Sequence, residues 1–181
     1  MTFHELLQKR QSCRAYKDIP VEREKLLTCI EAARLSPSAC NSQPWGFVVV
    51  DDPVVAKQIP PLMQSGIMPI NRFTQDCNAF IIVVEEPTNI SSKLGSTIKN
   101  QQFAQIDIGI ASHALCLSAA EQGLGSCIMG YFNEKKIKGL LGIPLSKRIR
   151  LIIAIGYPTD TDPLRRKVRK PIEEILHLNK W

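Results

Sequence analysis

Hydrophobic residues recur along this chain at two different spacings, and each spacing predicts a different element. From Glu22 to Leu35 and from Phe103 to Gln122, apolar residues fall three or four positions apart, which is the spacing of one helix face. Phe80 to Val84 and Arg150 to Gly156 are instead short, continuous apolar runs rich in β-branched residues, which is typical of strands buried on both faces. The chain is therefore predicted to combine helices with strands.

Turn and capping residues predict the shorter elements. Trp45 to Val50 and Ser126 to Met129 are predicted to be two further strands. Short helices are predicted from Thr2 to Lys9, from Asn133 to Leu141 and from Pro171 to Leu176, because threonine, asparagine and proline favour the first positions of a helix.

Two stretches lack a clean periodicity. Pro and Gly residues interrupt Val54 to Phe73, which is predicted to be an irregular helical segment, and Glu86 to Gln101 is polar and loop-like. Four strands flanked by helices predict an α+β fold arranged as a three-layer sandwich. No internal repeat or linker divides the chain, so residues 1–181 are predicted to form a single domain.

The composition is that of an ordinary globular protein. Hydrophobic residues make up 44% and charged residues 22% of the 181 residues, which argues against wholesale disorder. No continuous apolar run approaches the ~20 residues of a membrane span, and the first residues are too polar for a secretory signal. The six cysteines include no CxxC pair, so free thiols and no metal site are predicted. These features predict a cytoplasmic protein that binds no membrane.

The net charge of +6 is concentrated near the C-terminus. Eight cations lie between Ser146 and Lys170, and Asp160 and Asp162 are the acidic residues there, so this window carries the whole net charge. Such a cluster is compatible with a solvated basic face, an acidic partner, nucleic acid or a bound phosphate. Aromatic residues make up only 6% of the chain, and none lies between Leu164 and Lys170, so nucleic acid binding is disfavoured.

Three segments combine residues that suit an anionic ligand. They are Arg10-Gln11-Ser12-Cys13-Arg14, the small polar loop from Ser36 to Trp45, and Lys167-Val168-Arg169-Lys170-Pro171. Positions two apart share a side of an extended segment, so the two arginines and the serine of the first segment face one way, as do the lysine and arginine of the third. Taken singly, each segment is also explained by surface charge or by ordinary turn residues.

Taken together and in this order, these segments resemble the FMN-dependent nitroreductase family over nearly the whole chain. The resemblance rests on Arg10-x-Ser12-x-Arg14, on Ser36-Pro37-Ser38 through Asn41-Ser42-Gln43-Pro44-Trp45, on Met129-Gly130-Tyr131-Phe132, and on Lys167-x-Arg169-x-Pro171. It implies a nitroreductase-like α/β/α sandwich with a central mixed or antiparallel sheet. It also implies a homodimer with FMN at the subunit interface, for which the helix from Phe103 to Gln122 is the candidate dimer core.

The resemblance further implies roles for particular residues. The N-terminal Arg10 and Ser12 and the C-terminal Lys167 and Arg169 match positions that hold the phosphate and ribityl chain. Pro37, Ser38 and Asn41 match a loop that reaches the flavin from the partner subunit, Asn71 matches an amide at the pyrimidine edge, and Met129 and Gly130 match backbone near N5. The complete set of implied cofactor-binding residues is Arg10, Gln11, Ser12, Arg14, Pro37, Ser38, Ala39, Asn41, Asn71, Ile128, Met129, Gly130, Lys167 and Arg169.

The implied activity is electron transfer from NAD(P)H, through flavin N5, to a nitroaromatic or quinone-type acceptor in a ping-pong scheme. No side chain is implied to be catalytic, and Arg14 is the candidate cation that tunes the flavin. Where many members carry a second cation three residues after the asparagine, this chain has Thr74. Two alternatives stay open: a reductase of enones, quinones or free flavins with little nitro activity, and a non-enzymatic basic binding protein.

The physical chemistry of FMN agrees with this assignment. Its phosphate is a dianion, which arginine forks bind bidentately and to which lysine adds a point charge. Hydrogen bonds to charged groups contribute roughly 1.5–3 kcal/mol each, so two or three of them with a buried ring account for about micromolar binding.

Overall fold

A central antiparallel sheet organises the chain. The computed structural model describes residues 1–64, 70–89 and 101–181. Its four strands are β1 (Trp45–Val50), β2 (Ala79–Glu85), β3 (Gly125–Met129) and β4 (Arg148–Gly156). They lie in the order β1-β2-β4-β3, and every neighbouring pair is antiparallel. The predicted sheet is thus confirmed, and it is antiparallel throughout its four described strands.

The sheet is buried on both faces. Along β2, Phe80 and Ile82 pack into one hydrophobic cluster, whereas Ile81 and Val83 pack into the other. All four side chains are fully buried. Because alternate strand residues point to opposite faces, this division shows that helices cover both sides of the sheet, as the continuous apolar run predicts.

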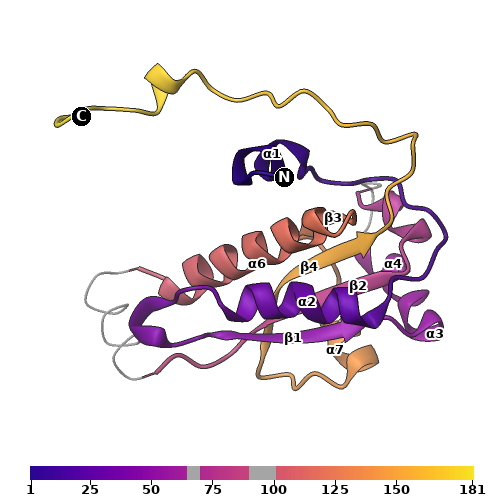
Figure 1. Ribbon diagram of the computed structural model, residues 1–181. Coiled ribbons are helices and arrows are strands. Elements are labelled where there is room, and N and C mark those ends of the chain that lie inside the picture. Colours follow the sequence, from indigo (N-terminus) through magenta and orange to yellow (C-terminus); the bar gives the residue numbers. More distant parts are fainter. Residues whose placement is uncertain (65–69, 90–100) are drawn as a thin grey trace.

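The helices form the two outer layers (Figure 1). One layer pairs α2 (Arg23–Arg34) with the longest helix, α6 (Phe103–Glu121). The opposite layer contains α3 (Pro53–Ala56), α4 (Ile59–Met63) and α7 (Glu134–Leu141). A further helix and three 3₁₀ turns complete the described elements: α1 (Phe3–Lys9), η1 (Ala39–Asn41), η2 (Arg72–Asp76) and η3 (Ile172–Glu174).

Most element boundaries agree with the sequence pattern. Thr2 and Asn133 cap α1 and α7 through their side chains, as predicted. The irregular stretch from Val54 to Phe73 contains most of α3, all of α4 and part of η2. Its residues 65–69 lie outside the described residues, as do residues 90–100 of the predicted loop. The helix predicted from Pro171 to Leu176 is reduced to the single turn η3, which buries no side chain against the rest of the chain.

Helix α6 is long and apolar enough to cross a membrane, but it is a core helix. Its Ile108, Leu115 and Ala119 side chains are buried in the hydrophobic cluster shared with α2 and the sheet. Helix length and hydropathy alone therefore do not indicate a membrane span here.

The two ends of the chain run together beside the sheet. The Lys17 N–H donates to the Tyr157 carbonyl at 2.8 Å, and the Thr159 N–H donates to the Ala15 carbonyl at 3.1 Å. The C-terminal segment extends away from the sheet (Figure 1). Residues 168–181 are all exposed. This pairing brings residues about 150 positions apart to one site.

Candidate functional site

A strongly basic pocket lies where the two ends meet. Its volume is about 170 Å³, and six cations and two polar residues line it: Arg10, Gln11, Ser12, Arg14, Arg165, Arg166, Lys167 and Arg169. The first four belong to the segment after α1, and the other four belong to the C-terminal segment. The structure therefore brings together the two basic segments that the sequence singled out, and it adds Arg165 and Arg166.

The N-terminal wall of the pocket is fixed by its buried residues. The Cys13 N–H donates to the Ser126 carbonyl of β3 at 2.9 Å, and the Tyr16 hydroxyl donates to the Cys13 carbonyl at 3.0 Å. Both side chains are buried over Gly125 and Gly156, which are paired across β3 and β4. Since Cys13 faces the sheet, the neighbouring residues Ser12 and Arg14 remain available to line the pocket.

The C-terminal wall places cations close to one another. The Lys167 ammonium donates to the Arg10 carbonyl. Burial lowers the pKa of Lys167, and the positive charges of Arg10, Arg169 and Arg165 lower it further. Such crowding opposes the protonated form, and a bound anion would relieve it.

One buried nitrogen in this region has an unused donor. Among the described residues, the Arg10 Nε is buried and has no hydrogen-bond acceptor. An unpaired buried donor is costly, and a guanidinium is the side chain best suited to phosphate oxygens. The arrangement therefore fits a phosphate monoester better than a neutral ligand.

The polar loop from Ser36 to Trp45 lies at a different end of the molecule. Its backbone has positive φ angles at Cys40, Asn41 and Gln43, and the Ser38 hydroxyl accepts from the Gln43 N–H at 2.9 Å. The Asp107 carboxylate, near the start of α6, accepts from the Ala39 N–H at 3.1 and 3.2 Å. Asp107 is buried, and no motif in the sequence singles it out.

This loop and the basic pocket do not meet within one chain. Arg10 and Gln11 share a neighbouring cavity of about 380 Å³ with Ala120, at the far end of α6. Ala120 lies 13 positions after Asp107, which corresponds to about 20 Å along the helix axis. The implied loop residues Pro37, Ser38, Ala39 and Asn41 therefore stand apart from the implied phosphate residues.

The remaining implied residues lie near the end of β3. Met129 is buried, Ile128 is 40% exposed, and an added Cβ at Gly130 would meet no atom within 4 Å, so crowding within the chain does not require this glycine. The Asn71 Nδ2 donates to the Tyr131 carbonyl at 2.9 Å and to the Met63 carbonyl at 3.3 Å. The amide of Asn71 is therefore engaged by the backbone of its own chain.

Thr74 holds this same turn. Its hydroxyl donates to the Asn71 carbonyl at 2.7 Å, and its side chain is fully buried. It therefore stabilises the backbone of η2 and supplies no charge at this position.

All six cysteines are free thiols, as predicted, and five are buried. Burial raises the pKa of Cys77 to about 12 and the pKa values of Cys13 and Cys116 to about 11. We expect iodoacetamide at neutral pH to modify the exposed Cys40 first, because the thiolate is the reactive form and the others are also shielded. Peptide mass spectrometry measures this order, and modification of Cys77 before Cys40 would contradict it.

The chain is similar to known proteins over most of its length. The model of the nitroreductase family matches residues 7–72 and 68–157. A relative from Archaeoglobus fulgidus named "Putative NADH dehydrogenase/NAD(P)H nitroreductase" is 31% identical over 180 residues, which cover 97% of this chain and 97% of the relative.

Two solved structures illustrate the likeness in fold. An FMN-dependent nitroreductase from Clostridium difficile has a TM-score of 0.71 and 27% identity, and the match covers 97% of this chain and 98% of that one. A nitroreductase family protein from Streptococcus pneumoniae has a TM-score of 0.81 and 24% identity, with 98% and 100% covered. Fold, family model and full-length identity agree, so this chain is by homology an NAD(P)H oxidoreductase of the nitroreductase type and belongs to the nitroreductase family.

Proposed function

We propose that this chain is an FMN-dependent enzyme that transfers electrons from NAD(P)H to nitroaromatic or quinone-type acceptors by a ping-pong mechanism. The observation that carries the proposal is the basic pocket, which guanidinium and ammonium groups from both ends of the chain line, together with the buried, unpaired Nε of one lining residue, Arg10. A family that includes an FMN-dependent member supports the choice of FMN over other phosphorylated ligands.

In this proposal, side chains of both walls hold the phosphate and ribityl chain. Arg10 and Ser12 act from the N-terminal wall, and Lys167 and Arg169 act from the C-terminal wall. Arg14 supplies a positive charge closer to the ring, while residues 128–130 and Asn71 border the ring itself. When bound, FMN supplies the hydride-accepting and hydride-donating chemistry, so no dedicated nucleophile is needed from the chain.

We further propose that the single 181-residue domain works as a cytoplasmic homodimer. The loop residues Pro37 to Asn41 stand apart from the basic pocket within one chain, and in the proposed dimer they reach the flavin of the second copy. Exposed apolar side chains support such an interface: Ile106 and Ile110 of α6, and Leu164, Val168, Ile172, Ile175, Leu176, Leu178 and Trp181 of the C-terminal segment. Size-exclusion chromatography with light scattering measures the assembly, and an active monomer would contradict it.

The visible spectrum of the purified protein tests the proposal. We expect the absorption of oxidised flavin, and its loss when NADH or NADPH is added without oxygen. Addition of a nitroaromatic or a quinone should then restore the absorption. A colourless protein that binds no added FMN would overturn the proposal, and restoration by enones or free flavins alone would assign a different acceptor class.

Replacing Arg14 by alanine is expected to change the flavin potential more than its occupancy. A cation near the ring favours the more negatively charged, reduced state, so its loss should lower the midpoint potential, by about 30 mV if the loss is ~1.4 kcal/mol for a two-electron couple. Spectroelectrochemical titration measures this shift. Arg14→Lys keeps the charge and should retain most of the wild-type potential, and an unaltered potential in Arg14→Ala would remove the proposed role.

A further inference from the structure

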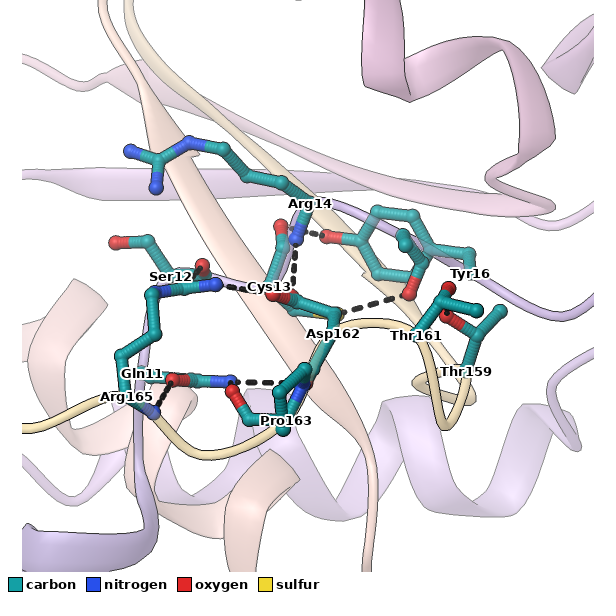
Figure 2. A network of polar contacts seen from close by, with 11 residues as sticks. Gln11, Ser12, Cys13, Arg14, Tyr16, Thr159, Thr161, Asp162, Pro163 and Arg165 are labelled. Carbon is teal, nitrogen blue, oxygen red and sulfur yellow. Dashed lines mark hydrogen bonds and ion pairs between the residues drawn. The ribbon is translucent and has the colours of Figure 1, made fainter.

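We propose that Asp162 is a positioning residue for the phosphate pocket, with Gln11 as its partner in this role. The inference rests on the proposed binding of FMN. Asp162 does not line the basic pocket itself but borders the neighbouring cavity. Its carboxylate accepts from the Arg14 N–H at 2.8 Å and forms an ion pair with the Arg165 guanidinium (Figure 2). Asp162 thus contacts both walls at once.

Gln11 joins the same two walls through its amide group. Its Nε2 donates to the carbonyls of Pro163 at 3.1 Å and Asp162 at 3.3 Å, and its Oε1 accepts from the Arg165 N–H at 3.0 Å. Figure 2 shows these contacts beside the Asp162 carboxylate. Both ends of the amide are therefore engaged by the C-terminal segment, which gives Gln11 a use other than direct contact with the cofactor.

The network also fixes the turn that presents Asp162. The Asp162 N–H donates to the Thr159 carbonyl at 3.2 Å, and the Thr159 N–H donates in turn to the Ala15 carbonyl. Arg165 additionally donates to the Ser12 carbonyl. Lys167 and Arg169 follow two and four positions later, so the place of these two cations depends on where Arg165 is held.

Burial and charge distinguish positioning from a simple electrostatic effect. The Asp162 side chain is only 9% exposed, and a buried carboxylate persists where its hydrogen bonds and ion pair compensate for lost water. As a negative charge beside an anion site, Asp162 would by itself repel phosphate, so neutralising it should tighten FMN binding. A positioning role predicts the opposite sign, because loss of the ion pair frees the C-terminal wall and adds the cost of ordering it to binding.

The test compares FMN with riboflavin, which lacks the phosphate, in fluorescence-quenching titrations of the flavin-free full-length protein. We expect Asp162→Asn to weaken FMN binding at least tenfold and to leave riboflavin binding unchanged. Asp160→Asn is the matched control: it removes the same charge two positions away, where the side chain is fully exposed and 3.9 Å from Lys17. This control should bind both ligands as the wild type does.

Each result decides the question. Equal or tighter FMN binding by Asp162→Asn overturns the positioning role, as does an equal loss of FMN and riboflavin binding, which would indicate a general defect. If Asp162→Asn does not fold, Gln11→Met removes the three hydrogen bonds of the side-chain amide while keeping the side-chain length. The same loss of binding affinity, confined to FMN, is then expected. If the wild type itself does not prefer FMN over riboflavin, the phosphate pocket fails along with this inference.

Discussion

Arg10→Ala is expected to weaken FMN binding by at least tenfold, a loss of about 1.4 kcal/mol or more. The arginine carries the buried Nε that has no acceptor among the described residues, so a phosphate oxygen would gain a charge-assisted hydrogen bond there. Such bonds contribute roughly 1.5–3 kcal/mol. Arg169→Ala should have an effect of the same size from the opposite wall. Titration of flavin fluorescence measures both dissociation constants.

Two controls test whether the loss of affinity is specific to Arg10 and to the phosphate. Arg34→Ala removes an exposed arginine that pairs with Glu31 on α2, and it should leave FMN affinity unchanged. Riboflavin binding should be unaffected in Arg10→Ala, since this ligand has no phosphate to lose. If Arg10→Ala and Arg169→Ala both retained the wild-type dissociation constant for FMN, the basic pocket would not be the phosphate site.

The sequence predicts the elements well because their signals are local. The capping box at Thr2 and Glu5 and the cap at Asn133 each involve residues three positions apart, and both are present. The uninterrupted apolar run of β2 predicts burial on two faces, which both hydrophobic clusters confirm. Helix 171–176 is the exception, since a capping proline cannot sustain a helix that buries no side chain.

The architecture of the pocket is harder to predict, because its contacts are distant in sequence. Charge counting treats Asp162 only as a residue that offsets the basic window, whereas in the structure it joins Arg14 to Arg165. Asp107 similarly looks like one polar residue in a helix, yet it holds the loop at Ala39, 68 positions earlier. No spacing rule reveals such pairs. Recognition of the basic segments could suggest that they meet, but not which residues bring them together.

The packing of Cys13 and Tyr16 against the sheet explains why two glycines face the N-terminal wall. An added Cβ at Gly125 would lie 2.6 Å from the Cys13 Sγ and 2.7 Å from the Cys13 Cβ, and one at Gly156 would lie 2.8 Å from the Tyr16 Cδ1. These distances are well inside van der Waals contact. The bare backbone of β3 and β4 thus lets the segment that carries Arg10, Ser12 and Arg14 lie against the sheet.

Gly125→Ala is therefore expected to lower the free energy of unfolding by about 1–3 kcal/mol, because the Cys13 Cβ is fixed to the backbone and cannot rotate away. Urea denaturation measures this loss, and FMN affinity should fall with it as the N-terminal wall shifts. Gly139→Ala, in α7, meets no atom within 4 Å and should not destabilise the chain. Adding Cys13→Gly to Gly125→Ala removes both clashing atoms, so FMN affinity should recover in part. A Gly125→Ala protein with wild-type stability and affinity would show that the segment need not lie this close to the sheet.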